Sequence, residues 1–366
     1  MKTFTLFLSL IYITEILAVS GCVVSSPSGE SAKGATKWVD LGRGVSLEVV
    51  YVPPGEFKMG STPVEKTWAV GPEGGARFSS GGGAREAYEG ESRPMRVKAG
   101  VWMGRTEVTV GQFRRFADET GFVTDAEKPG GTAHVFNRNW VPAEVGKPPH
   151  PWAVMETKSW RNPNHGIPQQ ENHPVVCVSY NDMKAFCKWL TETERKAGRL
   201  PEGMDYRLPT EAEWAYACRG GRRDSSYYWW GNMLRNGKGR LNIAGTDFLP
   251  DKNWAWPGVN APWKDGFPMV SPVDHFGERG RNGFGLADMC GGVWEFTLDH
   301  FDPKGGHEEV HYKDAKLRTV SRPVCRGGNY YDVPGNTRCA VRLGIGSVTY
   351  SDSRDGFRIC LGVSRD

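Results

Sequence analysis

One short motif in the chain has the spacing of a catalytic metal site. His307 and His311 flank Glu308 in the pattern His-Glu-x-x-His, which on a helix places both imidazoles on one zinc ion and the glutamate beside a bound water. Gly305 and Gly306 precede the motif, no apolar periodicity surrounds it, and neither His nor Glu follows it to act as the usual third ligand. We therefore interpret it as a solvated loop, with a zinc hydrolase as the weaker alternative.

Cysteines form a second group of reactive side chains. Apart from Cys22 there are seven: Cys177, Cys187, Cys218, Cys290, Cys325, Cys339 and Cys360. None has CxxC spacing, so the sequence does not predict a zinc cluster. Seven is an odd number, so at least one of these thiols would stay unpaired even in an oxidising compartment, where disulfides persist.

The composition predicts a globular protein rich in loops. The 366 residues are 39% hydrophobic and 24% charged, as in soluble domains, and a net charge of +4 without a basic cluster does not suggest nucleic acid as a partner. The 14 Trp and 47 Gly indicate irregular structure in which large aromatic side chains supply much of the packing. No internal repeat and no break between two domains is visible.

The N-terminus resembles a bacterial lipoprotein signal. An apolar run, Phe4–Leu17, follows Lys2 and is short for a membrane span but suits a signal peptide. Val19-Ser20-Gly21-Cys22 resembles a lipobox, in which the cysteine is acylated and becomes the mature N-terminus. No aspartate follows Cys22, so we expect an exported protein anchored by lipid at the outer membrane. An ordinary signal peptide with an incidental cysteine is the alternative.

These features define the expected domain organisation. We expect a signal peptide at 1–21, a lipidated cysteine and flexible Ser/Gly/Ala-rich tether at 22–37, and one domain at 38–366. Within it, residues 47–52 are typical of a strand and 71–91 of a glycine-rich loop.

Three helices are predicted from capping boxes followed by apolar residues at helical spacing. The boxes are Thr109-x-x-Gln112, Ser179-x-x-Asp182 and Thr210-x-x-Glu213. We interpret their apolar stripes as core packing and not as cofactor sites.

Several blocks, in order, resemble the sulfatase-modifying-factor (formylglycine-generating enzyme) family. They include Phe57-Lys58-Met59-Gly60, Arg207–Trp214, Arg326–Asp332, Arg338–Arg342 and Gly356-Phe357-Arg358. Each block alone is weak, but their ordered recurrence from about residue 49 to 360 is specific. The resemblance implies an irregular, single-domain α+β fold related to C-type lectins, with little regular secondary structure.

The reaction centre of that family is altered here. In the family, a cysteine follows Gly-Gly-Ser-Tyr-x and a second comes five residues later; the two thiolates bind copper(I), and oxygen converts a sulfatase cysteine to formylglycine. Here Asn329 replaces the serine, Asp332 replaces the first cysteine, and the loop that follows is shorter. A carboxylate is a hard, poor ligand for copper(I). Although Trp294 is retained, we expect the thiol–copper centre to be missing and copper not to be a cofactor.

The resemblance also implies two structural calcium sites, each a hard, all-oxygen ligand set. The first comprises the Asn242 side chain, the Ile243 carbonyl, Asp265 and the Phe267 carbonyl, and the second comprises Asp288, the Gly291 and Val293 carbonyls, and Glu295. Solvated loop carboxylates are the alternative interpretation of Asp265 and Glu295.

Two disulfides are likewise implied by the resemblance, Cys187–Cys360 and Cys218–Cys339. Cys177, Cys290 and Cys325 are left over, either to include a bridge or to act as small buried apolar side chains.

The leading expectation is therefore a non-catalytic binding or assembly role at the cell envelope, with a protein or glycan ligand at the cell surface. Aromatic residues at 227–230 and 254–256 could line a groove for such a ligand, and core packing explains them equally well. The rival is an oxidase, an atypical copper- and oxygen-dependent formylglycine generator that acts on sulfatase cysteines.

Overall fold

A computed structural model describes residues 32–76, 89–139, 151–248, 261–301 and 322–365. All of them belong to one compact unit that begins at Ala32. The predicted signal peptide, Cys22, the aromatic residues at 254–256 and the His-Glu-x-x-His motif at 307–311 lie outside the described residues. Among the described helices, none is both long and apolar enough to cross a bilayer.

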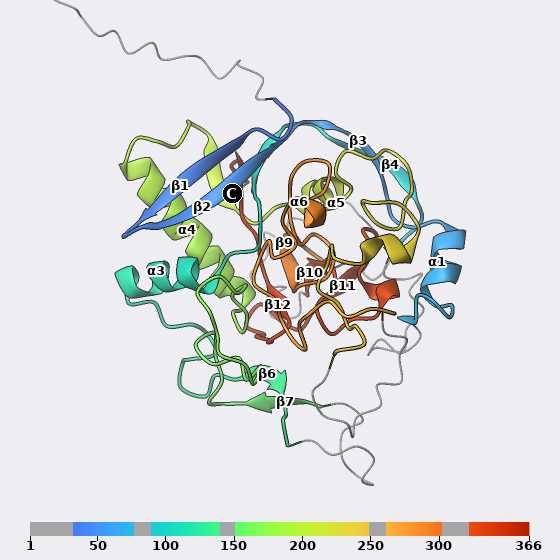
Figure 1. Cartoon of the computed structure of the whole chain (residues 1–366). Coiled ribbons are helices and arrows are strands. Elements are labelled where there is room, and N and C mark those ends of the chain that lie inside the picture. The colour runs from blue at the N-terminus through green and yellow to red at the C-terminus, as the bar shows by residue number, and fades with distance from the viewer. Residues whose placement is uncertain (1–31, 77–88, 140–150, 249–260, 302–321, 366) are drawn as a thin grey trace, which may run out of the picture. The chain divides into compact units, whose positions relative to one another are not determined.

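The largest sheet has five antiparallel strands and joins the two ends of the described chain (Figure 1). Its order is β1 (Thr36–Gly42), β2 (Val45–Val52), β5 (Val101–Gly104), β13 (Cys360–Val363) and β8 (Met204–Arg207). The strand predicted at 47–52 is therefore confirmed. The pairing continues upstream, because the Tyr51 amide donates to the Ala35 carbonyl at 2.8 Å. The compact unit thus includes residues 32–37, which were predicted to belong to the tether.

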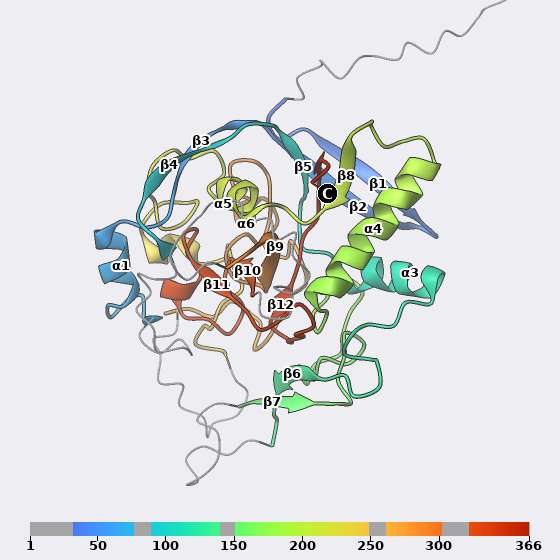
Figure 2. The same cartoon turned by 180° about the vertical axis from the view of Figure 1, so that it is seen from behind.

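The three predicted helices are present, each with its capping box. They are α3 (Val110–Thr120), α4 (Tyr180–Lys196) and α5 (Glu211–Cys218). Helix α4 runs beside β8 (Figure 2), and α3 contacts β2. Phe113, Phe116 and Phe186 on the apolar faces of α3 and α4 are buried in the first hydrophobic cluster, so these stripes form core.

A second sheet has the order β11 (Arg342–Gly344), β10 (Pro323–Arg326), β9 (Trp294–His300) and β12 (Asp355–Gly356), with β12 parallel to β9. Two hairpins are added: β3 (Gly55–Met59) with β4 (Arg93–Val97), and β6 (Ala133–Phe136) with β7 (Trp152–Met155). Short helices are α1 (Pro63–Ala69), α6 (Gly277–Gly280) and the 3₁₀ turns η2 (Leu234–Gly237) and η3 (Pro334–Asn336).

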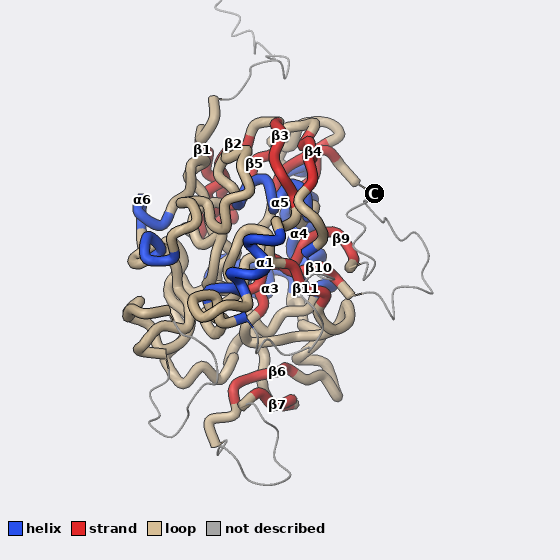
Figure 3. The backbone as a smooth tube through the Cα atoms, turned by 90° about the vertical axis from the view of Figure 1, so that its right-hand side faces the viewer, coloured by secondary structure: helices blue, strands red, loops and turns tan. Residues whose placement is uncertain are grey.

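Much of the backbone between these elements is loop (Figure 3), which confirms the irregular structure expected from the glycine and tryptophan content. The mixture of helices and sheets confirms the α+β fold that the family resemblance implied. Aromatic side chains provide much of the packing. Phe113, for example, contacts the rings of Phe116, Trp160 and Phe186 at centroid distances of 5.2–6.0 Å. Tyr227 and Tyr228 are buried and Trp230 stacks on Tyr228 at 4.4 Å, so at 227–230 packing accounts for part of the aromatic cluster.

Candidate functional site

The segment after β10 is held in place by glycines that allow a close chain crossing. Gly327 and Gly328 have φ angles of 98° and 77°, in the left-handed region that favours glycine. A Cβ on Gly328 would lie 2.5 Å from the Asn336 carbonyl oxygen. The Tyr330 amide then donates to the Gly292 carbonyl at 2.7 Å. This fixes the 327–332 turn against the chain just before β9.

Asp332, at the position of the family's first cysteine, is half-buried and uses its carboxylate to close its own loop. The carboxylate accepts hydrogen bonds from the Asn329 amide at 3.2 Å and from the Asn336 side chain at 2.9 Å. Five residues on, Thr337 is fully buried and its hydroxyl donates to the Pro334 carbonyl at 3.2 Å. A carboxylate and a hydroxyl therefore occupy positions 332 and 337.

Asn329 and Asp332, two of the three residues predicted at the altered reaction centre, lie in one turn. Asn329 is buried, and its side-chain oxygen accepts from the Tyr331 amide at 2.7 Å, beside Asp332. Trp294, the third of these residues, lies on β9 and packs in the first hydrophobic cluster. Tyr331, next to Asp332, packs in the third hydrophobic cluster, where its ring lies 5.0 Å from that of Trp152.

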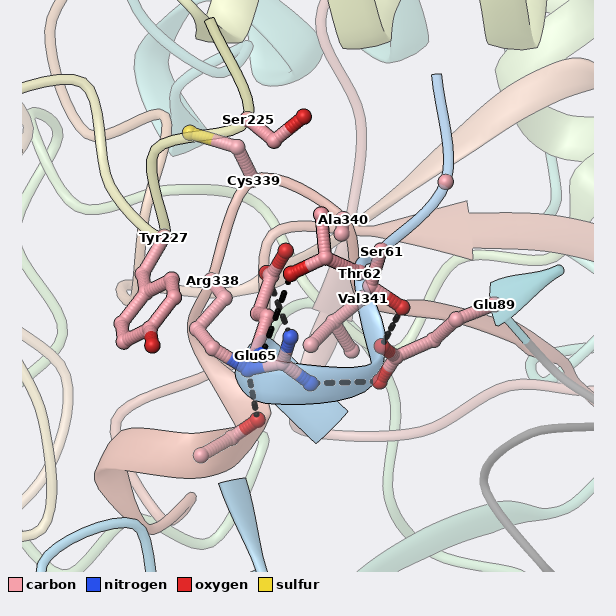
Figure 4. Close-up of polar contacts among 12 residues, drawn as sticks. Ser61, Thr62, Glu65, Glu89, Ser225, Tyr227, Arg338, Cys339, Ala340 and Val341 are labelled. Carbon is pink, nitrogen blue, oxygen red and sulfur yellow. Dashed lines mark hydrogen bonds and ion pairs between the residues drawn. The ribbon is translucent and has the colours of Figure 1, made fainter. Parts of the chain in front are cut away.

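Behind this loop, Arg338 is fully buried between two glutamates (Figure 4). Its guanidinium contacts Glu65 on α1 and Glu89, both at 2.5 Å, and donates to the Gly335 carbonyl at 2.9 Å. Burial raises the pKa of Glu65 to about 7, against the opposing charge of Arg338. Sequence reasoning missed both glutamates, because they precede Arg338 by about 250 residues or more in regions without a distinctive pattern.

The first predicted calcium set is assembled, but its oxygens already accept hydrogen bonds. Asp265 accepts from the Asn242 side chain and from the amides of Ile243 and Phe267, at 2.8–2.9 Å. The Asn242 oxygen accepts from the Ser271 amide at 3.0 Å. Burial raises the pKa of Asp265 to about 6. A cation here would have to displace these N–H groups, so this geometry fits calcium poorly.

The second predicted set surrounds a buried ion pair. Glu295 on β9 is fully buried, contacts the Arg358 guanidinium at 2.5 and 2.6 Å, and accepts from the Trp214 indole at 2.7 Å. Asp288 is also buried, with φ 57°, and accepts from the Asp274 amide at 2.6 Å. Burial raises the pKa of Asp288 to about 6. Gly291 and Val293, whose carbonyls complete the predicted set, lie between them in the chain.

A third carboxylate, which was not predicted as a ligand, joins this group. Glu107 is 2% exposed, and its Oε2 has no hydrogen-bond partner among the described residues. Burial, followed by the charges of Asp288 and Glu295, raises the pKa of Glu107 well above its usual value. A Cβ on Gly292 would lie 2.8 Å from the Glu107 carboxylate. We call Glu107, Asp288 and Glu295 the acidic cluster.

The acidic cluster has oxygen donors of the type that a hard cation prefers, but in the described chain the ligand atoms that converge within 4.8 Å are those of Cys218, Cys290 and Cys339 and not these carboxylates. Its three carboxylates are opposed by the guanidinium of Arg358, and one buried carboxylate oxygen is left without a partner. Uncompensated buried charge is costly, and calcium prefers carboxylate and carbonyl oxygens. No pattern in the sequence marked Glu107 as a ligand, because it lies about 180 residues before Asp288 in the chain.

The cysteines of the two predicted bridges lie close together, but the structure has them as free thiols. The sulfurs of Cys218 and Cys339 are 3.2 Å apart, against about 2.0 Å in a disulfide. Cys187 and Cys360 are buried electrostatic neighbours. Both bridges stay predictions. The third cysteine beside Cys218 is Cys290, with the two sulfurs 3.8 Å apart.

Comparisons with known proteins agree with this scaffold. The Sulfatase-modifying factor enzyme 1-like domain matches residues 43–362. Formylglycine-generating enzyme of Mus musculus is 32% identical over 256 residues, 66% of this chain and 60% of that protein, so the chain covers about three fifths of its length. Inactive C-alpha-formylglycine-generating enzyme 2 of Bos taurus is 29% identical over 346 residues, 90% of this chain and 93% of that protein.

Among solved structures, PvdO from Pseudomonas aeruginosa has a TM-score of 0.53 at 21% identity, covering 89% of this chain and 97% of that one, a likeness of fold. The family match spans the acidic cluster, the loop at Asp332 and the buried arginines alike. The chain therefore belongs to the sulfatase-modifying factor enzyme 1-like family.

Proposed function

We propose that this protein is a formylglycine-generating-enzyme-like domain with a binding or assembly role and without copper- and oxygen-dependent catalysis. The observation that carries the proposal is the state of Asp332. Its carboxylate stands at the position of the first reactive cysteine and accepts hydrogen bonds from Asn329 and Asn336.

The chemistry of the loop supports this proposal. Copper(I) binds soft thiolates, and the carboxylate of Asp332 and the hydroxyl of Thr337 are hard oxygen donors. Both groups are also engaged in hydrogen bonds within the loop, which would have to break before either could bind another group. The similarity to a relative named as inactive points in the same direction.

We further propose that calcium stabilises the domain at the acidic cluster. Asp288, Glu295 and the carbonyls of Gly291 and Val293 would supply ligands as the family resemblance implies, and Glu107 would add the carboxylate oxygen that lacks a partner. Bound calcium would supply positive charge that offsets the buried carboxylates. The Asn242–Asp265 set is a second candidate. Side-chain oxygens of both sets already accept N–H groups, and the acidic cluster differs in the Glu107 oxygen that has no partner among the described residues.

Export, a lipid anchor at Cys22 and a protein or glycan ligand at the cell surface complete the proposal. They rest on the signal-like run Phe4–Leu17 and the lipobox-like residues that precede Cys22. Labelling of cells with a radioactive or clickable fatty acid tests the anchor. The label should be lost in Cys22→Ala, and an unchanged label would contradict lipidation at this residue.

The catalytic part of the proposal is tested by incubating the full chain with copper(I), oxygen and a sulfatase-derived cysteine peptide, and following thiol-to-aldehyde conversion by mass spectrometry. A formylglycine-generating enzyme with both thiols is the positive control. The matched variant is Asp332→Cys, which is expected to stay inactive because the shortened loop at 333–337 contains no second cysteine. Conversion by the unmodified chain would identify it as an oxidase and overturn the proposal.

A further inference from the structure

Three cysteine sulfurs gather at one buried point, away from the loop at Asp332. Cys218 is the last residue of α5, Cys290 lies between α6 and β9, and Cys339 follows η3. Their Sγ atoms all lie within 4.8 Å of one another, at 3.2 Å for Cys218–Cys339 and 3.8 Å for Cys218–Cys290. All three residues are at most 1% exposed. We call them the thiol cluster.

The three sulfurs are close enough together to serve as a triangle of ligands, although the 3.2 Å between Cys218 and Cys339 would have to widen. An ion bonded to three sulfurs at about 2.3 Å places them about 3.8–4.0 Å apart, so small shifts would seat an ion between the side chains as they stand. A structural disulfide between Cys218 and Cys339 would need only two of the three cysteines, so it does not account for the presence of Cys290. No histidine or carboxylate joins the three in the part of the chain that the structure describes.

Two buried arginines give the thiol cluster a positive surrounding. Arg219 and Arg326 are 2% and 1% exposed, and the Nε of each lacks a hydrogen-bond partner among the described residues. Arg326 also donates to the carbonyl of Cys339 at 3.3 Å. Burial alone would disfavour a thiolate, but nearby guanidinium groups favour it, and metal binding requires deprotonated thiols.

We propose that the reduced thiol cluster is a binding site for a soft d¹⁰ cation of the copper(I) type, held by Cys218, Cys290 and Cys339. Soft thiolates select soft ions, and three ligands without a fourth suit copper(I) better than zinc, which is almost always four-coordinate in structural sites. This goes beyond the proposed function, since the site is buried and lies apart from the loop at Asp332. The disulfide predicted between Cys218 and Cys339 is the competing state, because it would leave a single thiol.

The test is a copper(I) titration of the full chain, reduced with a phosphine under argon, against the chromophoric chelator bathocuproine disulfonate. Cys290→Ala removes one proposed ligand, and Cys325→Ala is the matched control, because Cys325 is an equally buried cysteine on β10 outside the thiol cluster. We expect Cys290→Ala to lose one tightly bound copper(I) per chain relative to Cys325→Ala. Removing a group that only hydrogen-bonds to a metal ligand lowers metal affinity about 10–100-fold, so removing a ligand should lower the copper(I) affinity by at least this factor.

Circular dichroism and thermal unfolding establish that each variant is folded, and Cys290→Ser, which preserves side-chain volume, replaces Cys290→Ala if the latter is not. Equal copper(I) affinity and stoichiometry in the Cys290 and Cys325 variants would overturn the proposal. So would a Cys218–Cys339 disulfide that persists in the folded chain under reductant, detected by peptide mapping, because no three-thiol site would then exist.

Discussion

Two acidic regions of the molecule differ in how fully their carboxylates are compensated by hydrogen-bond donors and positive charge. At Asp332 a single half-buried carboxylate accepts two N–H groups of its own loop, and the loop is complete as it stands. In the acidic cluster, three buried carboxylates face the Arg358 guanidinium, and one oxygen of Glu107 has no described partner. The first region has Asp332 where the family has a reactive cysteine. The second has three buried carboxylates opposed by one guanidinium, and we propose that a bound cation offsets the remaining negative charge.

The difference suggests that the residues that stabilise the fold are not the residues that would carry out the family's reaction. Buried charge networks such as Arg338 with Glu65 and Glu89 connect distant segments, and removing one partner leaves an uncompensated buried charge. A change at the half-buried loop position 332 costs much less. The fold can therefore persist after the reactive thiols are gone.

The largest expected effect comes from Arg358→Met, which removes the cation facing the acidic cluster. Breaking a buried pair typically costs about 3–5 kcal/mol, because the carboxylates are left uncompensated. Urea denaturation in calcium-free buffer measures the loss. Arg114→Met is the control, since Arg114 and Glu171 are an exposed pair, for which about 0–1 kcal/mol is expected. Equal losses in the two variants would mean that the acidic cluster is not under electrostatic stress.

Calcium itself should have the next largest effect. Binding to the folded state alone adds about 2.7 kcal/mol when free calcium is 100 times the Kd, so chelation should lower the unfolding temperature. Glu107→Gln should shrink this calcium increment, because it replaces the carboxylate whose oxygen lacks a described partner with a neutral amide. Asp332→Asn is the control and should keep the full increment. An increment unchanged in Glu107→Gln would remove Glu107 from the calcium site.

The calcium increment should also decrease as pH falls from about 7.5 to 5.5. The pKa of Asp288 is raised in the folded state to about 6, above its unfolded value, and burial also raises the pKa of Glu107 well above its usual value. As pH falls through the folded pKa, these carboxyls take up protons, which stabilises the calcium-free fold and competes with calcium.

Comparing unfolding temperatures with and without calcium at each pH cancels the contribution of groups that titrate outside the calcium site. Buried His165, whose pKa is lowered to about 4 mainly by burial, is one of these. A calcium increment that grew on acidification would contradict the assignment.

The smallest effect is expected at the loop. Asp332→Ala removes two hydrogen bonds at a half-buried position and should cost about 1 kcal/mol, independent of calcium. Denaturation with and without calcium measures both values. A loss of several kcal/mol, or one that calcium restores, would place Asp332 in the structural framework and remove the contrast with the acidic cluster.

Local features of the fold could be predicted from the sequence, and long-range ones could not. The capping boxes at Thr109, Ser179 and Thr210 were predictable because both partners of each lie within one helical turn. The insertion of β13 between β5 and β8 pairs strands more than 150 residues apart, and no local pattern encodes that.

The same reason limited the prediction of the sites. Asn329 and Asp332 share one turn and were predicted together. Glu107, by contrast, reaches the acidic cluster from a position about 180 residues before it, and Cys290 joins Cys218 and Cys339 without any telling spacing. Only the folded chain brings these groups together.

Whether this chain is an oxidase is tested most directly by the yield of formylglycine peptide from the calcium-loaded protein supplied with copper(I) and oxygen. We predict no aldehyde above the level of an enzyme-free reaction, under conditions in which an active formylglycine-generating enzyme converts the same peptide. Copper- and oxygen-dependent aldehyde formation by this chain would contradict the account, because it would show that catalysis survives without a cysteine at position 332.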